Sequence, residues 1–198
     1  MDKHAYGIII LAAGNSSRLG EPKQLLQFKN TSLIRHVADA AVDAIGSPVI
    51  IVSGSNEKLI NNELNKLPVY LIHNADWQEG MASSISVGIQ EIIRINPSIK
   101  GVILAVSDQP FVTSQLFLDL IEKAESNEKC IVACSYEDTW GTPVLFPEKY
   151  FESLTSLNGT EGAKKLVKKF AASVVTVPFP MGGIDIDTKE DYQKLLNR

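Results

Sequence analysis

Short, continuously apolar runs alternate along this chain with segments of helical periodicity, and this alternation limits the folds it can adopt. Runs of isoleucine, leucine and valine without an alternating polar residue are typical of strands buried on both faces. Segments whose apolar residues recur every three or four positions predict amphipathic helices between them. The pattern therefore predicts a three-layer α/β/α fold with a mostly parallel sheet. The predicted strands are Tyr6–Leu11, Val49–Ser53, Val69–Ile72, Val102–Val106, Ile131–Ala133, Val144–Phe146 and Val174–Val177.

The clearest predicted helix spans Ser32–Ile45, where Leu33, Val37 and Ala41 lie on one apolar stripe behind a Thr31/Ser32 cap. No linker, repeat or low-complexity segment interrupts the chain, so residues 1–198 are expected to form one domain. In open α/β sheets, ligands bind at the carboxyl ends of the strands, which is where the chemical motifs of this chain fall. Further helices are predicted at Asn56–Leu67, Ser83–Ile95, Ser114–Glu125, Thr160–Phe170 and Lys189–Leu196.

The charge balance argues against a polynucleotide partner. The formal net charge is −4 and the isoelectric point is near 5.4, whereas proteins that bind phosphate backbones usually carry a clustered basic excess. The dense lysine cluster Lys164, Lys165, Lys168 and Lys169 has the spacing of a solvated helix face. No apolar stretch approaches the ~18 residues of a membrane span. We therefore expect neither a nucleic acid nor a membrane as partner.

Cys130 and Cys134 flank a predicted strand, where positions i and i+4 share a face but lie too far apart to form a disulfide. We expect two buried thiols in a reduced, cytoplasmic protein. The run from Met1 to Gly14 superficially resembles a signal peptide. Its charged region is mixed in sign, and cleavage would remove a glycine-rich loop, so no export signal is predicted.

That loop, from Leu11 to Lys23, directly follows the first predicted strand. Gly14 and Gly20 permit backbone angles that turn main-chain N–H groups toward an anion, and Arg18 and Lys23 add mobile positive charge. The spacing matches neither the dinucleotide fingerprint G-x-G-x-x-G nor the P-loop G-x-x-x-x-G-K-[ST]. We interpret the loop as a phosphate-binding element; the alternative is an ordinary strand-to-helix turn with exposed charges.

Aspartates follow two apolar segments and are candidate metal ligands. Asp108 comes just after a buried run, so its carboxylate should emerge at the edge of the sheet, where Mg²⁺ could take one or two carboxylates together with substrate phosphates. Asp185 and Asp187 share a face by their spacing of two. For Asp187-Thr188 the alternative, which we favour for Asp187, is an N-cap of the last helix.

The segment Trp77-Gln-Glu-Gly80-Met81-Ala-Ser-Ser84 precedes a predicted helix whose first N–H groups would face the sheet edge. The alternative is that Trp77 is a hydrophobic anchor and the serines cap the helix, and such capping is compatible with ligand contact. Gly141-Thr142-Pro143 has the residues of a turn, and an ordinary turn before the strand at residue 144 accounts for it almost as well as a turn with a role in ligand binding. His36 lies in mid-helix and His73 at a strand end, where both are interpreted as structural.

Taken together, these motifs resemble the MobA-like nucleotidyltransferases, most closely the molybdenum cofactor cytidylyltransferase branch. The resemblance rests on the pattern from Leu11 to Leu26 together with four later blocks in the same order. These blocks are Trp77–Ile85, Asp108-Gln109-Pro110, Gly141-Thr142-Pro143 and Asp185-Ile186-Asp187-Thr188-x-Glu190-Asp191.

The resemblance implies a Rossmann-like fold of the nucleotide-diphospho-sugar transferase (GT-A-like) type and a single MobA-like domain over residues 1–198. It implies transfer of CMP from CTP to a molybdopterin-type acceptor, with release of pyrophosphate, Mg²⁺ as cofactor and transient contact with a molybdoenzyme. Its catalytic residues would be Arg18, Lys23 and Asp108, and its metal ligands Asp108 and Asp185. The nucleotide would contact Leu11, Ala12, Ala13, Gly14, Arg18, Lys23, Gly80 and Ser84.

Two sequence details bear on the substrates. Guanylyl-transferring relatives usually carry Leu-Ala-Gly-Gly where this chain has Leu11-Ala12-Ala13-Gly14, and the methyl group of Ala13 would narrow a base pocket against a purine. The family pattern Gly-Asp-x-Gly-Ala-Arg is altered to Gly159-Thr-Glu-Gly-Ala-Lys164, on the side expected for the acceptor. A sugar-phosphate or alditol-phosphate acceptor, and a non-catalytic cofactor-binding or insertion chaperone, are the alternatives.

Overall fold

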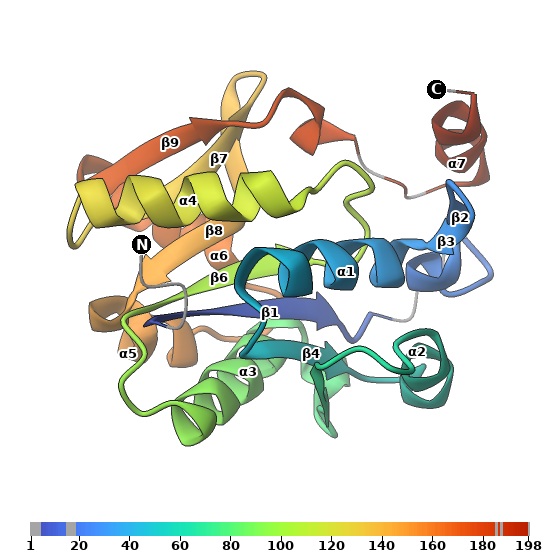
Figure 1. The fold of residues 1–198 in the computed structure, drawn as a ribbon, viewed down its shortest axis with the longest axis horizontal. Coiled ribbons are helices and arrows are strands. Elements are labelled where there is room, and N and C mark those ends of the chain that lie inside the picture. Colours follow the sequence, from blue (N-terminus) through green and yellow to red (C-terminus); the bar gives the residue numbers. More distant parts are fainter. Residues whose placement is uncertain (1–4, 15–18, 185, 187, 198) are drawn as a thin grey trace.

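A seven-stranded sheet forms the centre of the molecule (Figure 1). The computed structural model describes residues 5–14, 19–184, 186 and 188–197. The strand order is β5-β4-β1-β6-β8-β7-β9, and a short hairpin of β2 and β3 lies apart from the sheet. The strands are β1 Tyr6–Ala12, β2 Gln27–Phe28, β3 Thr31–Ser32, β4 Val49–Ser53, β5 Tyr70–His73, β6 Gly101–Val106, β7 Ile131–Tyr136, β8 Thr139–Pro147 and β9 Val174–Pro178.

Helices connect the parallel strands, as the alternating pattern predicts. The α-helices are α1 Leu33–Ile45, α2 Glu57–Glu63, α3 Met81–Ile95, α4 Ser114–Ser126, α5 Phe151–Thr155, α6 Ala163–Lys169 and α7 Lys189–Leu196. Short 3₁₀ helices are η2 Lys23–Leu25, η3 Trp77–Glu79, η4 Glu148–Tyr150, η5 Ala171–Ser173 and η6 Pro180–Gly183. No helix among the described residues is long and apolar enough to cross a lipid bilayer.

Alternate residues of the buried strands face two separate cores. Ile8 and Ile10 of β1 pack on the side of α1 and α4, which cross the front of the sheet in Figure 1. Ile9 points the other way, into a core built with α3, α5 and α6. The predicted fold, with helices on both faces of a mostly parallel sheet, is confirmed.

A third apolar cluster joins the end of the chain to its beginning. Leu195 of α7 and Ile186 pack with Leu19, Leu26, Phe28 and Leu33. The hydroxyl of Tyr192 donates to the Gln27 carbonyl at 2.8 Å, which holds α7 beside the β2–β3 hairpin (Figure 1).

Strand β8 departs from the sequence prediction. It runs antiparallel to both of its neighbours, β6 and β7, and it begins at Thr139, so Gly141-Thr142-Pro143 lies inside the strand. The interpretation of these residues as a turn before the strand is therefore wrong. The Thr142–Pro143 peptide bond is cis, and the register with β7 shifts between Ala133 and Cys134. Local turn propensity is outweighed here by pairing with two neighbouring strands.

Other local predictions are corrected at single residues. Cys134 is buried as expected, but Cys130 precedes β7 and is only half-buried; both thiols are free. The N-cap of α7 is Thr188, in a capping box with Asp191, which corrects the preference for Asp187 as the cap. Asp187 itself lies outside the described residues.

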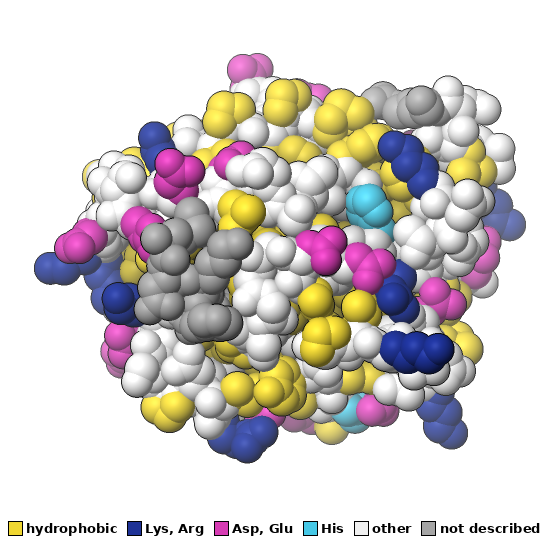
Figure 2. Space-filling view, in the orientation of Figure 1, with side chains coloured by type: hydrophobic (Ala, Val, Ile, Leu, Met, Phe, Trp, Pro, Cys, Tyr) yellow, Lys and Arg dark blue, Asp and Glu magenta, His cyan; other side chains and the backbone are white. Residues whose placement is uncertain are grey.

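On the face that α1 and α4 cover, basic and acidic side chains are scattered among apolar and neutral ones (Figure 2). The face of α1 and α4, as far as it is described, therefore offers no large patch of positive charge to a polynucleotide. The lysines of α6, which packs on the other side of the sheet, are exposed, as predicted from their spacing.

Candidate active site

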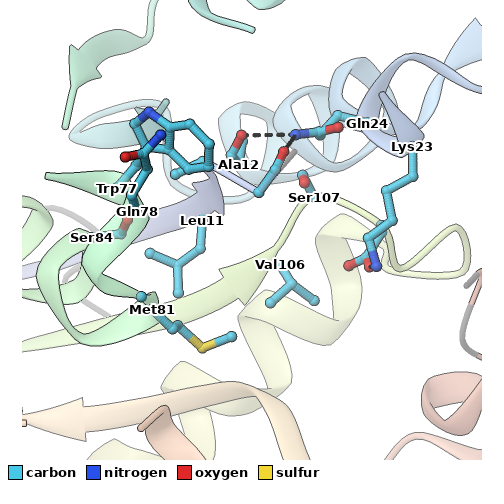
Figure 3. A pocket seen from close by; sticks show the side chains of 14 residues that line it. Leu11, Ala12, Lys23, Gln24, Trp77, Gln78, Met81, Ser84, Val106 and Ser107 are labelled. Atoms are coloured by element: carbon cyan, nitrogen blue, oxygen red, sulfur yellow. Dashed lines mark hydrogen bonds and ion pairs between the residues drawn. The ribbon is translucent and has the colours of Figure 1, made fainter. Parts of the chain in front are cut away.

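A cavity of about 360 Å³ opens where β1 and β6 end, at the carboxyl edge of the sheet (Figure 3). This volume falls within the ~300–1,000 Å³ range of small-molecule sites. The walls come from the end of β1 and the loop after it, from η2, from η3 with the start of α3, and from the end of β6. The lining residues are Leu11, Ala12, Ala13, Gly14, Lys23, Gln24, Trp77, Gln78, Gly80, Met81, Ser84, Val106, Ser107 and Asp108.

Gln24 fixes the loop that follows β1. Its side chain is 2% exposed, and its Nε2 donates to the carbonyl of Ala12 at 2.9 Å and to that of Gly14 at 2.7 Å (Figure 3). These bonds satisfy two backbone acceptors where the strand hydrogen bonding ends. The sequence analysis gave Gln24 no role, although a polar residue directly after Lys23 was a visible signal.

Lys23 and Asp108 meet at the side of the cavity away from Trp77. The Lys23 ammonium forms an ion pair with Asp108 Oδ2, and both side chains are largely shielded from solvent. Lys23 lies in η2 and Asp108 follows β6, so the ion pair joins two predicted catalytic residues from distant parts of the sequence. The pair supplies one cationic and one anionic group to the same wall of the cavity.

The other predicted charged ligands cannot be located. Arg18 and Asp185 lie outside the described residues, so their roles stay predictions. Within the described part of the chain, no group of three or more His, Cys, Asp or Glu side chains could hold a metal. The Asp108 carboxylate is nevertheless suitable for Mg²⁺, which commonly binds one or two carboxylates, water and substrate phosphates.

The wall opposite Lys23 is formed by η3 and the start of α3. Trp77 packs on Gly54, where an added Cβ would lie 2.8 Å from the indole Cγ, and it also lines the cavity (Figure 3). Gly80 has φ +112°, and a Cβ there would lie 2.3 Å from the Gly159 carbonyl oxygen. Backbone packing is therefore sufficient to require glycine at residue 80. Anchoring by Trp77 and lining of a ligand cavity are both present.

Ser84 is placed by a buried network that the sequence analysis did not identify. Asn74, which is 1% exposed, donates through Nδ2 to the hydroxyls of Ser83 at 2.8 Å and Ser84 at 2.9 Å. Asn74 Oδ1 in turn accepts from the backbone N–H of Asp76 at 3.0 Å. The network orients the Ser84 hydroxyl at the cavity wall. The polar Asn74 at the end of an apolar strand was the available sequence signal.

Gln109 links the loop that carries Asp108 to two distant segments. Its Nε2 donates to the carbonyl of Thr142 in β8 at 3.0 Å and to that of Gly182 in η6 at 3.2 Å. Its Oε1 is buried and has no hydrogen-bond partner among the described residues. Gln109 thus braces the edge of the sheet beside Asp108, a role the sequence analysis also missed.

The predicted structural histidines lie elsewhere. His73 at the end of β5 is exposed and pairs with Glu57 at 3.3 Å. The ring of His36 packs edge-to-face with that of Phe28. Burial lowers the pKa of His36, and a hydrogen bond with the Val112 backbone acts in the opposite direction but is the smaller effect. No histidine is found among the described cavity-lining residues. The cavity wall offers Lys23 and Asp108 as its charged groups.

Comparison with protein families matches residues 8–174 to the MobA-like NTP transferase domain. A nicotine blue oxidoreductase from Paenarthrobacter nicotinovorans is 26% identical over 197 residues, covering 95% of each chain. The molybdenum cofactor cytidylyltransferase of Escherichia coli K12 is 23% identical over 113 residues, covering 57% of this chain and 56% of its own. Of these two relatives, the one that matches over the longer stretch bears the name of an oxidoreductase, and the one that matches over the shorter stretch bears the name of a transferase.

Solved structures share the fold over nearly the full chain. The Rv0371c protein of Mycobacterium tuberculosis H37Rv is 30% identical, with a TM-score of 0.81 and coverage of 98% of this chain and 97% of its own. A structure of that protein in complex with manganese is 27% identical in the aligned residues, with a TM-score of 0.77 and coverage of 97% and 98%.

Proposed function

The chain belongs to the MobA-like NTP transferase family, and we propose that it transfers CMP from CTP to the phosphate group of a molybdopterin-type acceptor, with release of pyrophosphate. An oxygen of the acceptor phosphate attacks the α-phosphorus, a new P–O–P linkage forms, and the bond to the bridging oxygen of the β-phosphate breaks. The similarity to the Escherichia coli molybdenum cofactor cytidylyltransferase supports the acceptor in this assignment.

The observation that carries the proposal is the Lys23–Asp108 ion pair at the edge of the cavity. A phosphate monoester is already anionic at neutral pH, so the attack needs no general base. The work left to the protein is to neutralise charge, align the groups and stabilise the leaving pyrophosphate. Lys23, together with Arg18, supplies positive charge for the triphosphate.

Mg²⁺ is proposed as the cofactor, with Asp108 and Asp185 as its protein ligands. When bound, the ion would neutralise the developing phosphate charge. In the structure Asp108 is paired with Lys23, so an incoming triphosphate offers the ammonium a second anionic partner and makes the carboxylate available. The manganese complex of the mycobacterial neighbour supports a divalent ion in this family.

The preference for CTP is supported by the wall at Ala13. This residue is 8% exposed and lines the cavity together with Trp77 and Gln78. Its methyl group takes up space that glycine would leave open to a larger purine base. Indole and amide side chains supply a stacking surface and hydrogen-bonding groups for a pyrimidine. We also place the reaction in the reducing cytoplasm, which agrees with two free cysteines.

The direct test is pyrophosphate release by the purified protein. CTP, GTP, ATP and UTP would each be supplied with molybdopterin, a sugar phosphate or an alditol phosphate, with and without Mg²⁺. Metal-dependent release of pyrophosphate with CTP and molybdopterin supports the proposal. Release only with a sugar phosphate or an alditol phosphate would show that this compound, and not molybdopterin, is the acceptor. Because one relative is named an oxidoreductase, oxidation of NAD(P)H by the protein is measured in parallel. Redox turnover without nucleotidyl transfer would overturn the proposal.

A further inference from the structure

The start of α3 carries two adjacent serines whose hydroxyls receive hydrogen bonds from one buried amide. Asn74, directly after β5, donates through Nδ2 to the Ser83 hydroxyl at 2.8 Å and to the Ser84 hydroxyl at 2.9 Å. The amide has two N–H hydrogens, so each serine receives one. Its Oδ1 accepts from the Asp76 N–H at 3.0 Å. Both hydrogens and the oxygen of this amide are therefore engaged, which fixes its orientation.

The sheet holds Asn74 in place. Asn74 is 1% exposed, and its backbone N–H donates to the carbonyl of Ser53, at the end of β4, at 2.9 Å. The Ser53 hydroxyl donates to the Ile72 carbonyl of β5 at 3.2 Å. The amide thus stands on the paired carboxyl ends of two strands, which position a side chain more precisely than a loop does.

The two serines differ in where their own hydroxyl hydrogens go. Ser83 donates to the backbone carbonyl of Gly80 at 2.9 Å, and the Asp76 carbonyl lies 3.0 Å from the same hydroxyl oxygen. Ser84 accepts from Asn74, but none of the described residues accepts a hydrogen bond from the Ser84 hydroxyl. A hydroxyl has one hydrogen to donate and two lone pairs to accept with. The hydrogen of Ser84 is therefore available to a ligand.

Ser84 lies at the cavity, on the wall formed by η3 and the start of α3 (Figure 3). It is 3% exposed, whereas Ser83 lines a separate hollow on α3. The hydroxyl hydrogen of Ser84 cannot point back at Asn74, because an N–H of that amide already fills that side. Ser84 therefore meets a ligand in the cavity as a hydrogen-bond donor.

We propose that Asn74 is a positioning residue for the nucleotide, because it holds the Ser84 hydroxyl so that its hydrogen is donated to the nucleoside. Lys23 and Asp108 lie on the opposite wall and attract the phosphates, which leaves the nucleoside toward Ser84. A buried donor without an acceptor costs binding free energy, so this point of the wall favours a carbonyl oxygen or ring nitrogen over an amino group. The inference rests on the proposed nucleotidyl transfer and adds a residue outside the cavity lining that acts on binding.

A double-mutant cycle on the purified protein tests this role. Asn74→Asp keeps the shape of the side chain and an acceptor for the Asp76 N–H. A carboxylate has no N–H to donate, so the Ser84 hydrogen turns toward it and away from the cavity. Ser84→Ala removes the hydroxyl outright. The carboxylate also repels the triphosphate, but it does so with or without the hydroxyl. The hydrogen bond is therefore measured by the difference between the effects of Asn74→Asp in the two backgrounds.

Isothermal titration with CTP gives the Kd of each variant. Ser84→Ala is expected to raise the Kd by roughly three- to tenfold, the size of one uncharged hydrogen bond. Asn74→Asp should raise it at least as much in the wild type, and by a factor roughly three- to tenfold smaller in the Ser84→Ala background. The value of kcat at saturating CTP should be unchanged in Ser84→Ala, because Lys23 and Asp108 keep their places.

Ser86→Ala is the matched control, because it removes a hydroxyl from the same helix outside the cavity lining. Its Kd for CTP should equal that of the wild type. Urea unfolding checks that each variant is folded. Asn74→Ala, which also lacks both N–H groups, replaces Asn74→Asp in the cycle if the carboxylate prevents folding.

Equal effects of the Asn74 substitution in both backgrounds, or an unchanged Kd in Ser84→Ala, would overturn the role of Asn74. Titration separates this result from failure of the proposed reaction. If the wild type binds CTP without transferring CMP, the reaction fails and the cycle still decides the assignment. If CTP does not bind, the cycle is run with whichever of GTP, ATP and UTP binds, and binding of none of them overturns both proposals.

Discussion

Lys23 and Asp108 form an ion pair across the gap between η2 and the loop after β6. Each charge is therefore balanced by the other before any substrate arrives. In the reaction that we propose, a bound triphosphate would change this balance, because it would offer the lysine a more highly charged anion. The two residues are thus the first place where nucleotide binding can be separated from chemistry by mutation.

Asp108→Asn should keep the fold and reduce metal-dependent transfer by about 100-fold or more, a typical loss when one preorganised electrostatic group is removed. The amide cannot balance a divalent ion as a carboxylate does. The measurement is kcat as a function of Mg²⁺ concentration, with a circular dichroism spectrum for folding. Asp43→Asn, on an exposed turn of α1, is the matched control. Full turnover by folded Asp108→Asn would remove Asp108 from the metal site.

Lys23→Ala should lower kcat/KM for the nucleotide by about 10- to 100-fold, since hydrogen bonds to charged groups contribute roughly 1.5–3 kcal/mol. Arg18→Ala is predicted from the sequence to act in the same direction. Initial rates over a range of CTP concentrations measure both effects. Lys58→Ala, on the exposed surface of α2, should leave kcat/KM unchanged. Unaltered kinetics in the Lys23 variant would make that lysine a surface residue without a role in transfer.

Gln24→Met removes both hydrogen bonds to the loop while keeping a side chain of similar length. Leaving the buried Ala12 carbonyl unsatisfied should lower the free energy of unfolding by about 1–3 kcal/mol, and the freed loop should weaken nucleotide binding. Urea unfolding and nucleotide titration measure the two effects. Gln27→Met is the comparison, because Gln27 is exposed and its Nε2 donates to the Leu25 carbonyl at the long distance of 3.4 Å. Equal stability of the two variants would contradict the role assigned to Gln24.

Ala13→Gly should reduce discrimination between CTP and GTP, because it removes the methyl group from the cavity wall. A single methyl typically contributes only ~1–3 kcal/mol to selectivity, so a partial change is expected. Paired kcat/KM values for both nucleotides, in the wild type and the variant, provide the measurement. A wild type that prefers GTP would overturn the cytidylyl assignment without removing the chain from its family.

His36 should make stability depend on pH. Burial lowers its pKa below the ordinary value of 6.5, so the unfolded chain takes up the proton first as the pH falls. The contribution of His36 to the free energy of unfolding is therefore fully present above pH 6.5, and it declines as the pH falls from that value to the lower pKa of the folded state. Urea unfolding from pH 8 to pH 5 should show a steeper loss for the wild type than for His36→Phe. Parallel curves would contradict the assignment.

The fold was predictable where one residue pattern determines one element. The apolar run at Val49–Ser53 became β4 with the same bounds, because a strand covered on both faces needs no polar position. The direction of β8 was not predictable, since it depends on pairing with β6 and β7 rather than on its own residues. Helix α5 was missed because five residues are too few to show a period of 3.6.

The cavity shows the same division. Residues 11–14, Lys23, Gly80 and Ser84 line it with Asp108, and their contact with a nucleotide stays a prediction. Gln24 and Gln109 escaped prediction because their partners are backbone carbonyls in other segments, up to Gly182 for Gln109. A carbonyl has no residue-specific signal, so such bonds emerge only when the chain is folded. Arg18 and Asp185 stay predictions.

The apolar cluster that joins α7 to Leu19 and Leu26 makes the last part of the chain a support for its first loop. Leu195 and Ile186 cover residues on either side of Lys23, and Tyr192 reaches the Gln27 carbonyl. A shortened carboxyl terminus, or a bulky fusion placed directly after α7, would therefore act on the wall of the cavity that contains Lys23. For expression, an affinity tag at this terminus should be separated from α7 by a flexible spacer, so that the helix stays packed against this cluster.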